Sequence, residues 1–355
     1  MKILQKKIEN HYSKQLPFVV YNKPNSEEVC GMFQKDASLH VLANSFDKQG
    51  FVFAPFQSSG TTVLIPLEAS EVLYDAISSS DKAASEHQFT ADVASKTMHM
   101  DLVEKGVTAI QEAQFEKVVL SRKQEVDLGQ IDIVNTYTKL LQAYPNAFVY
   151  VWFHPEIGLW FGATPETLVQ LQENEFTTMS LAGTQPYSET VATTWSQKEI
   201  DEQAFVTKYI TDKLSNFSKT VEVSKTTTVK AGSLAHLRTD IRGILDTSKE
   251  NALFSLVAAL HPTPAVCGLP KEAAVAFIEK NEQYDRGYYT GFLGELRAGE
   301  AGVNEAHLFV NLRCMELQNS KAYIYVGGGI TKDSDPYKEW LETVAKSAIM
   351  FNVLD

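Results

Sequence analysis

Residues 327–346 read GGGITKDSDPYKEWLETVAK and combine a glycine run with the start of a helix. Glycine has no Cβ, so the run lets backbone N–H groups approach an anion closely, although a plain turn is the alternative interpretation. Asp335 followed by Pro336 is typical of a helix N-terminus, and we predict a helix from there to about residue 351. Within it, Glu339 and Glu342 are three residues apart and therefore share one helical face.

A second pair of glutamates follows a second helix signal. Ser196-Gln-Lys-Glu199 is a capping-box pattern and predicts a helix over residues 197–217, with Glu199 and Glu202 on one face. If the two helices converge, their four carboxylates form a hard-oxygen site suited to Mg²⁺, which prefers one or two carboxylates with waters and substrate oxygens. The alternative is that these glutamates are solvated helix surface and that Glu199 only completes its capping box.

Strands dominate the rest of the chain. Apolar spacing predicts one further helix over residues 91–114. Short apolar runs predict strands at residues 117–122, 147–153, 159–161, 168–171, 308–312 and 323–326. Because these strands do not alternate regularly with helices, we predict an α+β fold.

Composition indicates a globular protein. Of the 355 residues, 44% are hydrophobic and 21% charged, enough for a large core in one domain or two. A formal net charge of −12 without a Lys/Arg run argues against nucleic-acid binding. No stretch approaches the ~20 apolar residues of a membrane span, and three scattered cysteines indicate neither a disulfide framework nor a zinc site. We therefore expect a cytoplasmic protein.

Three further charged residues are candidates for chemistry. Lys117 opens an apolar strand and could act as a base if burial favours its neutral form. Glu166 lies in a turn and could act as an acid if burial raises its pKa. Arg313 offers a planar fork to a carboxylate. Each is more often a surface charge or a structural ion pair, so these residues alone leave the function open.

Eight strings, taken together, resemble the chorismate-utilising enzymes, which include isochorismate, salicylate, anthranilate and aminodeoxychorismate synthases. The strings are KVVLSR (117–122), GATPET (162–167), SLAGTQP (180–186), EIDEQAFV (199–206), HPTPAVCGLP (261–270), YDRGYYTGFLGE (284–295), NLRC (311–314) and GGGITKDSDPYKEWLETVAK (327–346). The resemblance implies that residues 91–355 form the chorismate-binding catalytic region. It implies that residues 1–90 are a variable N-terminal part of the same fold.

The resemblance also implies an architecture and a set of site residues. It implies two large packed β-sheets flanked by outer helices, with the active site between the sheets. It implies that Mg²⁺ is held chiefly by Glu202 and Glu342, and that Glu199 and Glu339 lie nearby and contact the metal through waters. The substrate-binding residues that it implies are Ala182, Gly183, Thr184, His261, Arg313, Gly328, Gly329 and Lys346.

The activity implied is that of an isochorismate synthase, which feeds menaquinone or catechol siderophore synthesis. Lys117 would deprotonate a water that attacks ring carbon 2, and Glu166 would protonate the hydroxyl that leaves ring carbon 4. Family members that use water resemble this chain in having lysine at that position, whereas ammonia users usually have glutamine, so no glutaminase subunit is expected. Ala182 stands where aminodeoxychorismate synthases carry a nucleophilic lysine, which excludes that covalent intermediate. We expect a monomer.

Two departures from the family pattern leave alternatives open. Gln203 stands where many relatives have histidine, and Gly287 stands where many isochorismate synthases have glutamate. The glycine resembles salicylate-forming and aminating members. Salicylate synthase, which eliminates pyruvate after forming isochorismate, is therefore the main alternative. An aminating enzyme and a non-catalytic chorismate-binding protein are the others.

Overall fold

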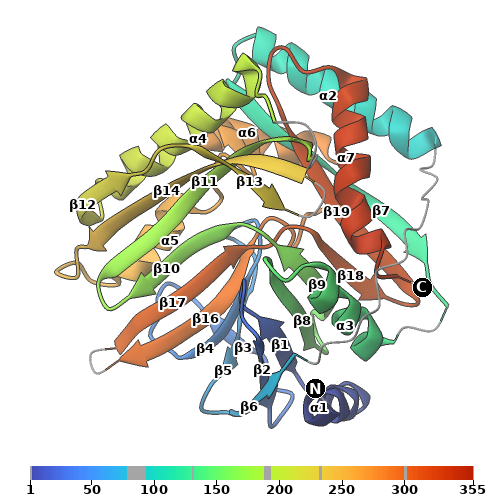
Figure 1. Cartoon of the computed structure of the whole chain (residues 1–355), viewed down its shortest axis with the longest axis vertical. Helices are drawn as coiled ribbons and strands as arrows, with labels where there is room; N and C mark the ends of the chain where they lie inside the picture. The colour runs from blue at the N-terminus through green and yellow to red at the C-terminus, as the bar shows by residue number, and fades with distance from the viewer. Residues whose placement is uncertain are drawn as a thin grey trace.

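The computed structural model of the chain describes residues 2–77, 93–129, 132–187, 193–231, 234–299 and 302–354. These residues form two antiparallel β-sheets that pack together and are flanked by helices (Figure 1). The helices are α1 (Lys2–Ser13), α2 (Val93–Gln111), α3 (Ile133–Ala143), α4 (Gln197–Leu214), α5 (Ala252–Leu260), α6 (Lys271–Asn281) and α7 (Pro336–Phe351). The α+β fold of two packed sheets with outer helices, predicted from the sequence, is confirmed.

The first sheet has nine strands in the order β15-β7-β19-β18-β9-β8-β1-β2-β6. Their bounds are β15 (Gly268–Leu269), β7 (Lys117–Asp127), β19 (Lys321–Ile330), β18 (Cys314–Gln318), β9 (Gly158–Thr164), β8 (Phe148–His154), β1 (Phe18–Asn22), β2 (Glu28–Gln34) and β6 (Ser70–Ala76). The middle of this sheet therefore joins strands from the beginning, middle and end of the chain.

The second sheet has ten strands in the order β12-β14-β11-β10-β17-β16-β4-β5-β3, and β13 pairs with β14 outside this path. Their bounds are β12 (Ser218–Val223), β14 (Leu234–Leu245), β11 (Glu175–Pro186), β10 (Thr167–Gln172), β17 (Gly302–Val310), β16 (Phe292–Gly299), β4 (Gly50–Ala54), β5 (Thr62–Pro66), β3 (His40–Leu42) and β13 (Thr227–Ala231). Strands β1 to β6 are divided between both sheets, so the N-terminal residues belong to the same packed body.

An aromatic core fills the space between the sheets. Every residue of β1 is buried, because alternate side chains point to opposite faces and both faces are covered. Tyr21 faces the second sheet, whereas Val20 packs into the cluster beneath α1 and α3. Across the interface, Phe148 of β8 stacks on Phe309 of β17 with ring centroids 4.2 Å apart. This core fixes the position of one sheet relative to the other.

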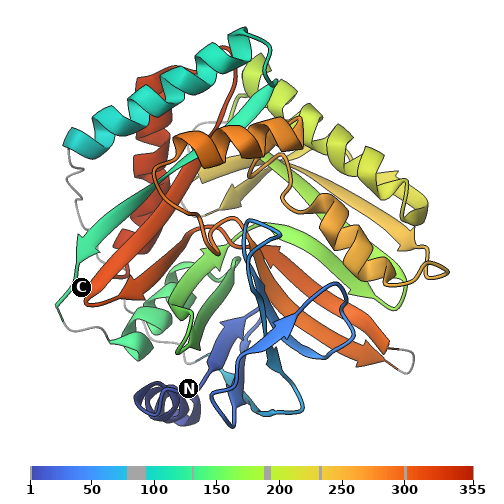
Figure 2. The same ribbon diagram turned by 180° about the vertical axis from the view of Figure 1, so that it is seen from behind.

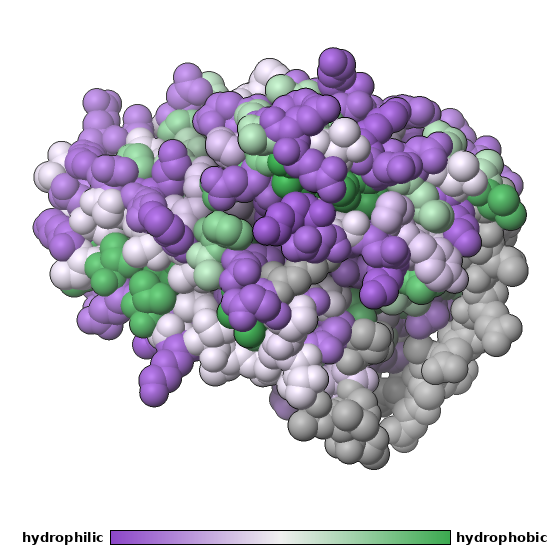
Figure 3. Space-filling view, turned by 90° about the horizontal axis from the view of Figure 1, so that it is seen from above, coloured by the Kyte–Doolittle hydropathy of each residue, from purple (hydrophilic) through white to green (hydrophobic). Residues whose placement is uncertain are grey.

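The helices cover the outer faces of the sheets (Figure 2). Val206, Ile210 and Leu214 form the apolar stripe of α4 and pack with α5 against the second sheet. Helices α1, α3 and α7 share a cluster with the first sheet, and α2 and α6 pack against β7. The surface seen from above is mainly hydrophilic (Figure 3). In the described residues, no helix is long and apolar enough to span a membrane.

Most of the predicted elements are present. The three predicted helices appear as α2, α4 and α7, although residues 91 and 92 lie outside the described part of the chain. The N-cap is confirmed, since the Asp335 carboxylate accepts a hydrogen bond from the Lys338 N–H at 2.8 Å. Helices α1, α3, α5 and α6 were not predicted. The sequence of α5, ALFSLVAAL, is almost wholly apolar and therefore lacks the polar face on which a helical period depends.

Candidate active site

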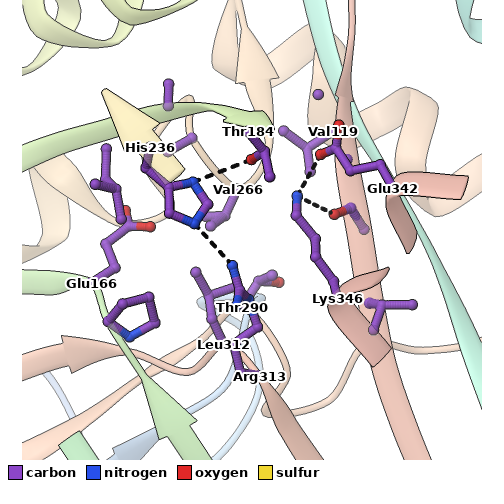
Figure 4. Close-up of a pocket in the computed structure, with 18 of the residues that line it drawn as sticks. Val119, Glu166, Thr184, His236, Val266, Thr290, Leu312, Arg313, Glu342 and Lys346 are labelled. Atoms are coloured by element: carbon purple, nitrogen blue, oxygen red, sulfur yellow. Dashed lines mark hydrogen bonds and ion pairs between the residues drawn. The ribbon is translucent and has the colours of Figure 1, made fainter. Parts of the chain in front are cut away.

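A cavity of about 100 Å³ lies where α4 and α7 begin, against β19 and β11 (Figure 4). Its lining comes from segments that are far apart in the sequence and meet through the strand order of the two sheets. The predicted site residues that line it are Glu166, Ala182, Gly183, Thr184, Glu199, Glu202, Arg313, Gly328, Gly329, Glu342 and Lys346. The cavity thus brings together three of the four glutamates, Glu199, Glu202 and Glu342, whereas Glu339 is not among its lining residues.

Two of these glutamates are each paired with a lysine. Lys117 Nζ lies 2.9 Å from Glu202 Oε1, and the side chain of Lys117 is almost fully buried at the start of β7. Lys346 Nζ donates to Glu342 Oε1 at 2.6 Å and to the Gly327 carbonyl at 3.0 Å. Figure 4 shows the second pair on the side of the cavity formed by α7. Each of these two carboxylates therefore has the ammonium group of a lysine as its counter-charge.

The other two glutamates have different surroundings. Glu199 accepts a hydrogen bond from the Ser196 N–H at 2.9 Å, so the capping box is confirmed. This contact fixes Glu199 in the first turn of α4 while leaving it in the cavity lining. Glu339 is buried in the first turn of α7, 3.3 Å from where a Cβ on Gly328 would stand. Both lie one helical turn before the glutamate that pairs with lysine.

These carboxylates suit Mg²⁺ better than a metal that takes all of its ligands from the protein. In the described part of the chain, no three carboxylate, imidazole or thiolate groups converge into a ready-made metal cluster. Mg²⁺ binds through one or two carboxylates when waters and substrate oxygens complete its octahedron. Glu202 and Glu342 line the same cavity and can supply these two carboxylates.

The glycine run lies inside β19 and is not a turn, which corrects one of the two interpretations of the sequence. Gly328 pairs with Leu120 and Gly329 pairs with Val119 in the register with β7. A Cβ on Gly329 would stand 2.6 Å from Glu202 Oε1 and 3.1 Å from Lys117 Cε. Glycine is therefore required because the Lys117–Glu202 pair occupies the space of a side chain.

Glu166 is a buried acid opposite α7. Its side chain is only 4% exposed, on the connection between β9 and β10. Burial raises its pKa from 4.5 to about 8, although the positive charges of Lys117, Arg313 and Lys346 act in the opposite direction. Near neutral pH the carboxyl is therefore mainly protonated and can donate a proton.

Arg313 is held by a histidine that the sequence interpretation missed. The Arg313 Nη2 group donates to His236 Nε2 at 3.2 Å, and His236 Nδ1 lies 3.0 Å from the Gly183 carbonyl and 3.2 Å from Thr184 Oγ1 (Figure 4). Because Nε2 accepts, Nδ1 carries the proton and donates to the carbonyl. Burial and the charge of Arg313 lower the His236 pKa to about 3, so the ring is neutral. The signal available in the sequence was a polar residue within the otherwise apolar and buried run Leu234–Leu237.

Three other residues named in the sequence interpretation have clear positions. Ala182 is buried in the lining, where its methyl group provides no nucleophile. His261 lies outside the lining and its Nε2 contacts the Pro55 carbonyl at 3.1 Å. Gln203 donates to the Ser180 carbonyl and to Thr239 Oγ1, each at 3.0 Å, so it ties α4 to the second sheet.

Comparison with known proteins identifies the family of this chain. The model of a family described as chorismate binding enzyme matches residues 60–355. Isochorismate synthase DhbC of Bacillus subtilis is 32% identical over 271 residues, and the alignment covers 71% of this chain and 66% of that protein. The salicylate biosynthesis isochorismate synthase of Pseudomonas aeruginosa is 31% identical over 261 residues, covering 71% of this chain and 53% of that protein. The chain thus spans between about half and two thirds of these relatives.

A solved structure shows the same fold over the whole length. The DhbC structure from Bacillus anthracis has a TM-score of 0.80 and 24% sequence identity, and the match covers 99% of each chain. The match of the family model and the relative at 32% identity confirm the family resemblance read from the eight strings. On the evidence of the family match and of these relatives, the chain belongs to the chorismate-binding enzyme family.

Proposed function

We propose that this protein is an isochorismate synthase that converts chorismate to isochorismate with Mg²⁺ as cofactor. The observation that carries the proposal is that the buried acid Glu166 lines the same cavity as Glu202, whose carboxylate pairs with the buried Lys117 at 2.9 Å. A matched acid and base are what the exchange of a ring hydroxyl for water requires. The relatives from Bacillus subtilis and Pseudomonas aeruginosa, both named as isochorismate synthases, support the same reaction.

The proposed reaction is a displacement with an allylic shift. Lys117 takes a proton from the water whose oxygen bonds to ring carbon 2. The ring double bond shifts, the bond between carbon 4 and its hydroxyl breaks, and Glu166 supplies the proton that this hydroxyl needs to leave as water. One water enters and one leaves, so the product is an isomer of the substrate.

The substrate dianion needs local positive charge in a protein of net charge −12. Arg313 offers its guanidinium fork to a carboxylate, while the neutral ring of His236 keeps that fork in place. Lys346 and the backbone of Gly328 and Gly329 would hold the second carboxylate. Mg²⁺ held by Glu202 and Glu342 would orient the ring carboxylate and offset its charge.

The position of Gly287 removes the reason for favouring salicylate formation. This glycine is the departure that resembles salicylate-forming relatives, but it has φ of 52° and lies outside the cavity lining. A left-handed backbone conformation favours glycine for reasons that are independent of catalysis. The proposal further includes a cytoplasmic monomer without a glutaminase subunit, in either the menaquinone or the siderophore pathway.

The test is product analysis with purified protein, chorismate and Mg²⁺, with a chelated sample as the matched control. We expect isochorismate on chromatography, no stoichiometric pyruvate, and no product in the chelated sample. Equimolar pyruvate and salicylate would assign the protein to the salicylate synthases. An aminated product formed with ammonium would make it an aminating enzyme, and chorismate binding without turnover would make it a non-catalytic binder.

A further inference from the structure

A second cavity adjoins the candidate active site on the side of β13, and we call it the β13 cavity. It has a volume of about 660 Å³, and its lining includes the connection between α3 and β8, parts of β13 and β14, and the C-terminal end of α7. In Figure 1 the lower end of α7 and helix α3 lie to the right of β13. Pro165, Leu181 and Arg313 line both cavities, so the two are neighbours across these residues.

The two cavities differ in size. Pockets that bind small molecules usually have volumes of ~300–1,000 Å³. The β13 cavity lies within this range, whereas the candidate active site, at about 100 Å³, lies below it. A small molecule therefore has room in the β13 cavity before it meets the narrower space around Glu166 and Glu202.

The charged residues of the β13 cavity are all positive. They are Lys230, Arg238 and Arg313, and no aspartate or glutamate is present among the described lining residues. The candidate active site, in contrast, is lined by four glutamates, Glu166, Glu199, Glu202 and Glu342, and the whole chain has a net charge of −12. A cleft lined by one sign of charge raises the association rate of an oppositely charged ligand ~10–10³-fold. The β13 cavity is thus suited to attract an anion that the rest of the protein repels.

The two outer cations are accessible to water and are also held in place. The Arg238 side chain is 37% exposed, and its Nε and Nη2 lie 2.8 and 2.7 Å from Asp240 Oδ1. Lys230 is exposed, and its Nζ lies 4.6 Å from the centre of the Tyr187 ring. Asp240 lies outside the lining but offsets part of the Arg238 charge, so the attraction is shared by the three cations. Arg313 is the most buried of them, at 8% exposure.

Apolar side chains form part of the wall between these cations. Met179, Leu181 and Ile349 belong to the lining, and each is less than 10% exposed. Apolar walls with a few charged groups are typical of sites that admit a small ring compound, because the walls accommodate the ring and the charges orient its carboxylates.

We propose that the β13 cavity is the entrance through which the anionic substrate reaches Arg313, and that Lys230 and Arg238 attract the substrate into it. The proposal rests on the function proposed above, since it takes the substrate to be a dicarboxylate such as chorismate. The two outer cations act before the substrate meets Arg313. They therefore contribute mainly to the rate of association and little to the lifetime of the complex.

The test measures the association and dissociation rate constants of chorismate, with Mg²⁺ present, by stopped-flow tryptophan fluorescence at low and high salt. Trp195 serves as a reporter, because its ring lies 3.4 Å from where a Cβ on Gly183 of the active-site lining would stand. The variants are Arg238→Gln and Arg238→Lys. Arg242→Gln is the matched control, since it removes the same charge from an exposed position of the same strand outside the lining. Values of kcat/KM at each salt concentration give a second measurement that does not depend on fluorescence.

We expect Arg238→Gln to lower the association rate constant ~3–10-fold at ~10 mM salt and less than ~2-fold at ~0.5 M salt, because salt screens the attraction. Arg238→Lys keeps the charge but loses the planar fork that binds Asp240, and it should stay within ~2-fold of the unmodified protein at both salt concentrations. Arg242→Gln should also stay within ~2-fold.

Equal losses in Arg238→Gln and Arg242→Gln would overturn the proposal, because they would reflect the net charge of the protein alone. A loss that persists at high salt, or that appears only in the dissociation rate constant, would overturn it too. Should Arg238→Gln fail to fold, Lys230→Gln against Lys225→Gln, at an exposed position outside the lining, decides in the same way. Failure of the proposed function would give a different result: chorismate would associate with the expected salt dependence and yield no isochorismate.

Discussion

Replacing Gly329 by alanine should test whether the Lys117–Glu202 pair must keep its position for catalysis. The new Cβ would stand 2.6 Å from Glu202 Oε1 and 3.1 Å from Lys117 Cε. Ordinary non-bonded contact lies near ~3.5 Å, so the carboxylate must move by about 1 Å. The atoms that must move lie at the ends of flexible side chains, so the backbone of β19 need not shift.

The expected loss of catalytic rate follows from that displacement of the Glu202 carboxylate. Misplacement of a reacting group by about 1 Å can cost ~10²-fold in rate, which corresponds to about 2.7 kcal/mol of barrier. The free energy of unfolding should change by less than about 1 kcal/mol, because a strand glycine replaced without backbone strain also lowers the entropy of the unfolded chain. Gly329→Ala should therefore fold normally and turn over chorismate ~10²-fold more slowly.

Gly328→Ala is the matched control. Its Cβ would stand 3.3 Å from Glu339 Oε2 and 3.5 Å from Glu342 Oε1, so the neighbours need to move only slightly. We expect a loss of less than about fivefold. The assay is the initial rate of isochorismate formation at saturating Mg²⁺, beside a melting curve for each variant. Near-normal turnover in Gly329→Ala, or equal losses in both variants, would refute the reasoning.

Four further predictions concern the charged groups. Glu202→Gln and Glu342→Gln should each remove most activity and weaken Mg²⁺ binding in calorimetry, and unchanged Mg²⁺ affinity would contradict the metal assignment. Lys117→Gln should slow turnover by ~10²–10⁴-fold with chorismate affinity within a few-fold, and a near-normal rate would exclude the base role. Because burial raises the Glu166 pKa from 4.5 to about 8, kcat should fall as pH rises through about 8. The stability that the neutral carboxyl contributes should be complete below pH 4.5 and should be lost as pH rises through about 8. The melting temperature of Glu166→Gln should show no such loss. Glu282→Gln should lower the free energy of unfolding, measured in urea, by ~3–5 kcal/mol, because the buried Arg286, which lies 2.6 Å from Glu282, loses its charged partner. A change under about 1 kcal/mol would contradict this.

The sequence by itself determined the local elements on which the site is built. Asp335 and Pro336 predicted the start of α7, and the Ser196–Glu199 capping box predicted the start of α4, because caps depend on side chains within three or four residues. Three-residue spacing also placed each pair of glutamates on one helical face. The eight strings identified the family, since their order along the chain is a property of the sequence alone.

Only the tertiary structure decided which groups meet and which are buried. His236 reaches Arg313 because β14 pairs with β11 in a register that sets Thr184 opposite His236, which no local pattern reveals. The same long-range packing buries Glu166 and places His261 outside the cavity. Caps and periodicity act over a few residues, whereas pairing and burial depend on strands that lie far apart in the chain, and their order becomes visible only when both sheets are assembled.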